Sequence, residues 1–323
     1  MRMEEVNERY YEEVQQVIAA VQQTVVGKEE CVVKAVAAIL AGGHILIDDI
    51  PGVGKTTLAM ALSRAMALES RRIQFTPDVL PSDIMGFSIY QKQTGNFVYQ
   101  PGAIMCNLFL GDEINRTSPK TQSALLEVME ENSVTVDGVT RRVPEPFVVI
   151  ATENPAGSVG TQMLPESQLD RFMICMTMGY PSLQHEIEIA KGRNEGKSVE
   201  DVPAVITAEE LVLIRASVDE IFVHEKIYEY ICTLVHKTRE NEYIDLGVSP
   251  RGTISLVKLA KAMAFLRKRS YVTPEDVADV FLDVTAHRVL LNARARAGHM
   301  TAEMVLMQLL KQEKKSVVQY RRG

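Results

Sequence analysis

Two patterns of hydrophobic and polar positions divide this chain near residue 180. Before that point, short apolar runs alternate with segments in which apolar residues recur at every third or fourth position. Such runs indicate buried strands, and the wider spacing indicates amphipathic helices. After residue 180 only the helical spacing continues. The pattern predicts an α/β region with a parallel sheet, followed by an all-helical region.

The elements of the first region can be placed from these runs. Strands are expected at 44–47, 72–75, 108–111, 147–152 and 173–178. Helices are expected at 4–22, 32–40, 58–66 and 119–132. Two pairs of short alternating segments, at 87–99 and 134–143, surround Thr94-Gly95 and Asp137-Gly138, which are turn dipeptides of β-hairpins.

The second region reads as a series of capped helices. They are expected at 208–222, 225–240, 250–266, 274–289 and 302–318. Thr207 and Glu210 form a capping box ahead of the first, and Thr273 with Pro274 starts the fourth in a comparable way. The composition changes at 179–182, so we predict two domains, an α/β module at 1–180 and a helical domain at 181–323.

Charge and hydropathy narrow the class of protein. The formal net charge of -7 argues against broad, nonspecific binding of nucleic acid, which depends on surplus Lys and Arg. No stretch approaches the roughly 20 apolar residues of a membrane span, and the first residues do not read as a signal peptide. We expect a cytoplasmic protein with no membrane insertion. The hairpin at 134–143 carries Arg141 and Arg142, and is either a substrate-contacting loop, which we slightly favour, or a solvated hairpin.

The strongest chemical signal is the segment from Asp49 to Thr57, which lies between a predicted strand and a predicted helix. A polyphosphate needs inward-pointing backbone N–H groups, a helix N-terminus and a cation, and here Gly52, Gly54 and Lys55 would supply them. Thr56 would hold magnesium. The expected nucleotide contacts are Gly52, Val53, Gly54, Lys55, Thr56 and Thr57. One departure is Asp49, which stands where the phosphate-loop pattern has its first glycine.

A second signal is the pair Asp112 and Glu113, which ends the predicted strand at 108–111. Two acids at a strand end downstream of a phosphate loop suit metal binding and water activation. Asp112 would bind magnesium, directly or through water, and Glu113 would orient and polarise the attacking water. A solvated acidic strand end is the alternative.

Three further positions are candidates for contacts to the phosphates. Asn154 follows the strand at 147–152, where its amide could hydrogen-bond the γ-phosphate and the attacking water. Arg171 is a candidate arginine finger, with an ordinary ion pair to Asp170 or Glu166 as the alternative. Arg251, at the head of the third helix of the second region, could be brought over the nucleotide by a lid.

The turn at Val25, Val26 and Gly27 is our candidate for packing against the purine, since such turns often precede a phosphate loop. A plain turn between two helices is an equal alternative.

Taken together, these residues resemble an AAA+ ATPase, and closely resemble the MoxR family, over essentially the whole chain. The most specific motifs are Gly111 to Arg116 with Pro119 to Gln122, Ala151 to Pro155, Leu164 to Phe172, and Ser249 to Arg251. The resemblance implies that Lys55 and Thr56 are Walker A, Asp112 and Glu113 Walker B, Asn154 sensor 1, Arg171 a finger acting on a neighbour's ATP, and Arg251 sensor 2.

The resemblance also implies a function. Members of this family are thought to form rings, expected here to be hexamers, that use ATP and Mg²⁺ to remodel or mature protein clients. Their partners often carry a von Willebrand A domain. The two hairpins would be the helix-2 insert and the pre-sensor-1 hairpin, facing a central pore. Alternatives that stay open are a DNA-acting or metal-chelatase-type AAA+ motor, and a nucleotide-gated assembly scaffold with little turnover.

Overall fold

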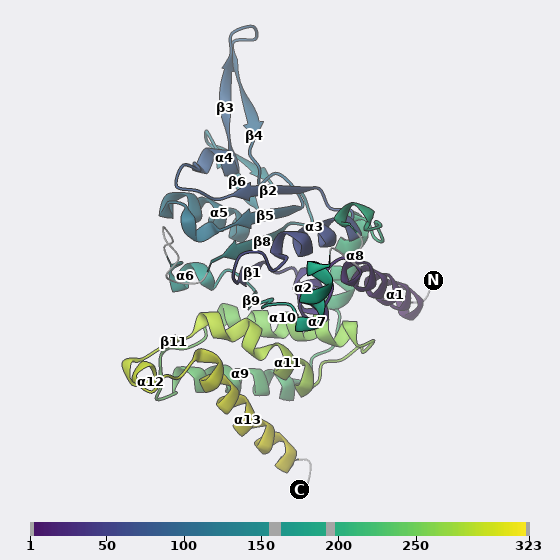
Figure 1. The fold of residues 1–323 in the computed structure, drawn as a ribbon, viewed down its shortest axis with the longest axis vertical. Helices are drawn as coiled ribbons and strands as arrows, with labels where there is room; N and C mark the ends of the chain where they lie inside the picture. The colour runs from purple at the N-terminus through teal and green to yellow at the C-terminus, as the bar shows by residue number, and fades with distance from the viewer. Residues whose placement is uncertain (1–2, 155–162, 192–197, 321–323) are drawn as a thin grey trace.

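The computed structural model describes residues 3–154, 163–191 and 198–320. Its long axis runs from a protruding hairpin, through an α/β region, to a group of helices at the opposite end (Figure 1). The predicted order of an α/β region followed by a helical region is confirmed.

A five-stranded parallel sheet forms the centre of the α/β region, in the order β2-β5-β8-β1-β9. The strands are β1 Ile45–Asp48, β2 Ser70–Gln74, β5 Leu108–Asp112, β8 Val148–Glu153 and β9 Ile174–Met176. All five expected strands are present. Because they are parallel, the residues that follow β1, β5 and β8 lie along one edge of the sheet.

Helices cover both faces of this sheet. They are α1 Met3–Gln22, α2 Glu29–Leu40, α3 Lys55–Ala65, α4 Pro81–Met85, α5 Pro119–Glu131 and α6 Glu166–Leu169, with a 3₁₀ turn η1 at Ile114–Arg116. Successive side chains of a strand point to opposite faces. Ile45 and Ile47 therefore join the larger core with α1, α2 and α3, whereas Leu46 joins the core that contains α5.

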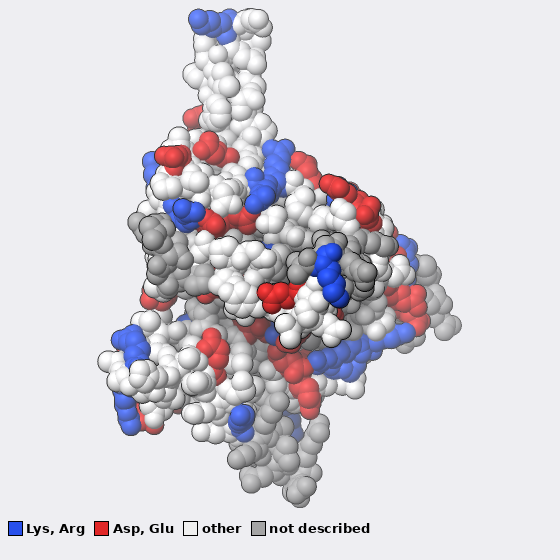
Figure 2. Space-filling view, in the orientation of Figure 1, with Lys and Arg blue, Asp and Glu red and all other residues white. Residues whose placement is uncertain are grey.

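Both predicted hairpins are present. The first, β3 Gly86–Gln91 with β4 Asn96–Pro101, projects far from the sheet (Figure 1). It exposes large apolar side chains on both strands, including Phe87 and Phe97, and its only charged residue is Lys92, in the turn between the strands. Figure 2 shows this hairpin largely uncharged, with basic atoms at its tip. The second hairpin is β6 Ser133–Val136 with β7 Val139–Arg142.

The two arginines of the second hairpin differ in their surroundings. The Arg141 guanidinium lies 4.0 Å from the centroid of the Tyr99 ring on the first hairpin, and it also donates to the Val139 carbonyl at 3.0 Å. A cation–π contact of this kind joins the hairpins and gives Arg141 a structural role. Arg142 is exposed.

The C-terminal region is helical, and it adds two helices and a short strand pair to the expected pattern. Its helices are α7 Leu183–Ala190, α8 Ala208–Asp219, α9 Glu225–Arg239, α10 Pro250–Leu266, α11 Pro274–Thr285, α12 Ala293–Ala297 and α13 Ala302–Tyr320, with 3₁₀ turns η2 Val199–Asp201 and η3 Ala286–Arg288. Strands were not expected beyond residue 180, but β10 Ile244–Leu246 pairs with β11 Leu290–Leu291. Such short, sequence-distant segments carry no strand signal of their own. Among the described residues, no helix has the length and hydropathy of a membrane span.

One buried arginine ties the helical region to the α/β region. Arg288, only 4% exposed, donates through Nε to Asp170 Oδ1 at 2.8 Å and through Nη2 to the Phe172 carbonyl at 2.6 Å. Asp170 also accepts from the hydroxyl of Ser249, the N-cap of α10, at 2.8 Å. The segment that carries Arg171 is therefore held by the helical region.

Candidate active site

The phosphate-loop segment forms a turn between β1 and α3. Gly52 and Gly54 have φ values of 86° and 96°, in the left-handed region that glycine tolerates best. A Cβ built on Gly52 would meet nothing within 4 Å, so the backbone here faces open space that a phosphate could fill. Lys55, Thr56 and Thr57 form the first turn of α3, whose N-terminal N–H groups favour an anion.

Lys55 lies at the point where β1 and β8 end. Its ammonium donates to the main-chain oxygen of Asp49 and, at 3.4 Å, to that of Glu153. Burial lowers the pKa of Lys55, and nearby carboxylates, which include Asp112 and Glu113, act in the opposite direction. The structure therefore brings the predicted cation and the predicted acid pair into one electrostatic neighbourhood.

Asp49 is buried and fully engaged, which explains how an acid fits at a position where a glycine is usual. Its Oδ1 accepts from the N–H of Ile50 at 2.8 Å. Its Oδ2 accepts from the N–H groups of Met178 and Gly179, each at 2.6 Å. These bonds connect the start of the phosphate loop to the segment that follows β9.

Asp112 ends β5 as a buried carboxylate with two side-chain partners. Thr152 donates to its Oδ1 at 3.3 Å, and Arg72 on β2 donates to its Oδ2 at 2.6 Å. Magnesium prefers oxygen ligands and keeps several of its waters, so the Thr56 hydroxyl and one Asp112 carboxylate suit it. Arg72 would share that carboxylate with the ion.

Glu113 has an unusual backbone for a non-glycine residue, with φ of 56°. Its N–H donates to the Thr152 hydroxyl at 3.0 Å, and its Oε2 accepts from Arg116 at 2.7 Å. Partial burial acts to raise the pKa of Glu113, but hydrogen bonds from Arg116 and Asn154 outweigh it and lower the pKa. Glu113 is therefore ionised at neutral pH, as a residue that orients water must be.

Asn154 is buried at the end of β8, beside Glu113. Its main-chain oxygen accepts from the Asn115 side chain at 3.0 Å, which fixes the backbone where the strand ends. The Asn154 side chain hydrogen-bonds Glu113, and the action of the two on one water stays a prediction. Pro155, the next residue of that motif, lies outside the described residues.

Arg171 and Arg251 form a separate cluster. Both pair with Glu130 in the last turn of α5, Arg171 at 2.8 Å and Arg251 at 2.5 Å. Arg171 also donates to the Leu126 carbonyl at 2.6 Å. Since α5 packs on the face of the sheet opposite α3, the two arginines gather on the side away from the phosphate-loop helix. The contacts of Arg251 place it beside Arg171 rather than on the phosphate loop of its own chain.

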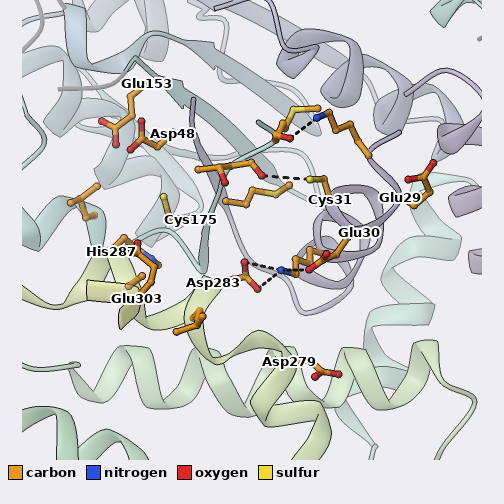
Figure 3. Close-up of a pocket in the computed structure, with 18 of the residues that line it drawn as sticks. Glu29, Glu30, Cys31, Asp48, Glu153, Cys175, Asp279, Asp283, His287 and Glu303 are labelled. Atoms are coloured by element: carbon orange, nitrogen blue, oxygen red, sulfur yellow. Dashed lines mark hydrogen bonds and ion pairs between the residues drawn. The ribbon is translucent and has the colours of Figure 1, made fainter. Parts of the chain in front are cut away.

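The turn at Val26 and Gly27 borders a cavity of about 970 Å³ between α2, β9 and α11. Gly27 has φ of 74° and lines this cavity, and Val26 is 42% exposed. Figure 3 shows acidic side chains around the cavity, among them Glu29, Asp48, Glu153 and Asp283. Burial raises the pKa of Glu153 to about 7, and Asp48 adds to this effect. Such a lining suits an uncharged base better than a phosphate.

Several residues of this site have no separate motif in the sequence. Arg116 could have been suspected, because residues three apart on a helical turn face the same side. Arg72 reaches Asp112 only through the pairing of β2 with β5, and Glu130 meets the two arginines only through packing of three segments. No local signal could have found these two contacts.

The chain is similar to known proteins in sequence and fold. A family model described as "ATPase family associated with various cellular activities (AAA)" matches residues 44–174, and an AAA lid domain model matches residues 236–307. A solved structure from Cytophaga hutchinsonii, described as a proposed ATPase, is 37% identical and superimposes with a TM-score of 0.88 over 95% of this chain and 96% of its own. Fold, phosphate loop and lid define the class as AAA+ ATPase.

Relatives narrow the class further. An uncharacterized protein of Bacillus subtilis, YeaC, is 45% identical over 90% of this chain and 91% of its own length. Chaperone MoxR1 of Mycobacterium tuberculosis is 35% identical over 91% of this chain and 80% of its own length. The chain belongs to the MoxR family of AAA+ ATPases, and this membership implies that it binds nucleotide.

Proposed function

We propose that the protein is a cytoplasmic, Mg²⁺-dependent ATPase that works as a ring, expected to be a hexamer, and uses ATP hydrolysis to remodel or mature protein clients. The family and the relative named Chaperone MoxR1 support a chaperone-like AAA+ function. A protein with a von Willebrand A domain is the expected partner, as family resemblance implies. We take 1–180 as the ATPase module and 181–323 as its lid.

The observation that carries the proposal is the separation of two sets of residues. Lys55, Glu113 and Asn154 gather at one edge of the sheet, whereas Arg171 and Arg251 gather on Glu130 beyond it. In a ring, each subunit presents two different surfaces to its neighbours. The arginine cluster of one subunit would then complete the phosphate site of the next, so both arginines act on a neighbour's nucleotide.

Each residue has a defined role in this reaction. Backbone N–H groups of the loop and Lys55 bind the phosphates, and the base occupies the cavity beside Gly27. Thr56 and Asp112 would hold the magnesium ion, which when bound neutralises charge on the phosphates. Glu113 orients the attacking water with the help of Asn154. Arg171 of the neighbour stabilises the charge that develops during transfer.

Protein clients would bind at the first hairpin, formed by β3 and β4. Its exposed Phe87, Ile89, Tyr90 and Phe97 supply apolar contacts, and Lys92 is its single charge. A chain that grips DNA needs many Lys and Arg near the phosphates. An apolar protein segment therefore fits this hairpin better than a nucleic acid does.

Mixing two inactive variants tests the shared site. Lys55→Ala removes the phosphate cation and Arg171→Ala removes the finger, so each alone should lose nearly all turnover. Equal mixing after subunit exchange creates sites with an intact loop facing an intact finger at roughly a quarter of interfaces, because neighbours combine at random. Recovery of about that share of the parent ATPase rate is expected. If both variants are inactive and the mixture stays inactive although subunits exchange, the shared site is wrong.

A further inference from the structure

Asp49 links the phosphate loop to the connection between the α/β module and the lid. Its Oδ2 accepts from two consecutive main-chain N–H groups, those of Met178 and Gly179, each at 2.6 Å. These residues follow β9 and precede α7, so they begin the passage into the C-terminal region. A carboxylate that accepts from two N–H groups makes strong, charge-assisted bonds.

Lys28 bonds to the carbonyl groups of the same segment. Its ammonium donates to the carbonyls of Met178, Gly179 and Tyr180 at 2.7, 3.0 and 2.9 Å. Lys28 directly follows Gly27 and precedes α2. The segment 178–180, which we call the connector, is thus held by an acid on its N–H side and by a base on its carbonyl side.

Asp49 is also in contact with the catalytic machinery. Its main-chain oxygen accepts from the ammonium of Lys55, and its N–H donates to the Glu153 carbonyl at 3.3 Å, one residue before Asn154. A movement of Lys55 would therefore change its hydrogen bond to the main-chain oxygen of Asp49. Its side chain extends the effect to the connector.

We infer that Asp49 is a positioning residue that couples occupancy of the phosphate loop to the connector, and through it to the lid. This inference rests on the proposed function and adds its regulation. A bound triphosphate orders the loop and engages Lys55, so the Asp49 carboxylate holds the two connector N–H groups more firmly. A glycine at this position would bind phosphate equally well but would leave the connector free of the loop.

The substitution Asp49→Gly tests the inference because it restores the usual phosphate-loop pattern. Amide hydrogen exchange of Met178 and Gly179 is measured with and without a non-hydrolysable ATP analogue and magnesium. In the parent, nucleotide should slow exchange at these two amides by about tenfold or more, the range expected for charge-assisted bonds. In Asp49→Gly, nucleotide should still bind, the slowing should disappear, and kcat should fall while KM stays near the parent value.

Two further variants keep the test decisive. Asp245→Asn, the matched control, makes the same chemical change at an exposed carboxylate on β10 and should leave the exchange response intact. Asp49→Asn keeps the shape and one acceptor oxygen, so it should fold even if Asp49→Gly does not, and should show a reduced but measurable response. If Asp49→Gly or Asp49→Asn responds to nucleotide as the parent does, the inference is wrong.

Failure of the inference can be told apart from failure of the proposed function. A parent protein that binds no nucleotide would overturn the proposed function and the inference with it. A parent that binds and hydrolyses ATP, but whose Met178 and Gly179 amides exchange at the same rate with and without nucleotide, would overturn the inference alone.

Discussion

The phosphate loop and the arginine cluster are built in different ways by the same chain. The loop is one continuous segment between β1 and α3. The cluster around Glu130 contains Arg171, from the segment after α6, and Arg251, from α10. Asp170, next to Arg171, is held in place by its ion pair with Arg288. One turn of backbone forms the first, whereas docking of the lid onto the α/β module is required for the second.

This difference predicts different responses to change. A substitution at Glu113 should affect chemistry and leave the fold intact, because its carboxylate pairs with Arg116, only three residues along the chain. A substitution in the cluster should affect stability, lid docking and the neighbour's active site together, because the same contacts serve all three.

The largest effect is expected from Glu113→Gln at the sheet edge. The amide cannot polarise water, so turnover should fall by about 10²- to 10⁴-fold, as for loss of a general base. Nucleotide affinity and thermal stability should stay near those of the parent. ATPase assays with equilibrium binding of a labelled nucleotide provide the check, with Glu220→Gln, an exposed lid residue, as control. A loss of binding equal to the loss of turnover would contradict the role of Glu113.

An intermediate effect is expected from Asp170→Asn in the cluster. The buried Arg288 would lose its charged partner, which should lower the free energy of unfolding by about 2–3 kcal/mol. Urea denaturation measures this, and ATP turnover at high protein concentration should fall as well. The control is Glu166→Gln, an exposed residue on the neighbouring helix α6, which should cost no more than about 0.5 kcal/mol. Equal midpoints for the two variants would show that the lid is not anchored through Asp170.

The smallest effect concerns acid pH and compares a histidine from each region. Burial lowers the pKa of His44, in the sheet core, to about 4, and that of His287, at the lid junction, to about 3. The unfolded chain binds these protons near pH 6.5 and the folded chain does not, so stability is lost as pH falls below 6.5. When the pH is lowered from 8 to 5.5, each of these two histidines should lower the free energy of unfolding by roughly 1 kcal/mol.

Glutamine variants separate the two histidines. His44 accepts from the Val149 N–H at 3.0 Å and donates to the Met129 carbonyl at 3.1 Å, a pair of bonds that glutamine can also make. His44→Gln and His287→Gln should each flatten the dependence of unfolding free energy on pH, measured by urea titration. An unchanged slope would exclude that histidine as a source of acid sensitivity.

The sequence by itself determined the local part of this protein. Apolar runs and helical spacing predicted the five strands of the sheet, both hairpins and the main helices, because each pattern is short and depends on neighbouring residues. The phosphate loop and the acid pair Asp112 and Glu113 were likewise visible, because their chemistry needs adjacent residues at the end of a strand. Asp49 was visible only as a departure from a pattern.

Only the tertiary structure decided what depends on contacts between distant segments. It showed that Asp49 bonds to Met178 and Gly179, that Arg72 pairs with Asp112, and that Arg171 and Arg251 meet on Glu130. It also revealed the pairing of β10 with β11. The physical reason is that side-chain hydrogen bonds and ion pairs act over a few ångströms in space, whereas sequence patterns report only on residues that are near in the chain.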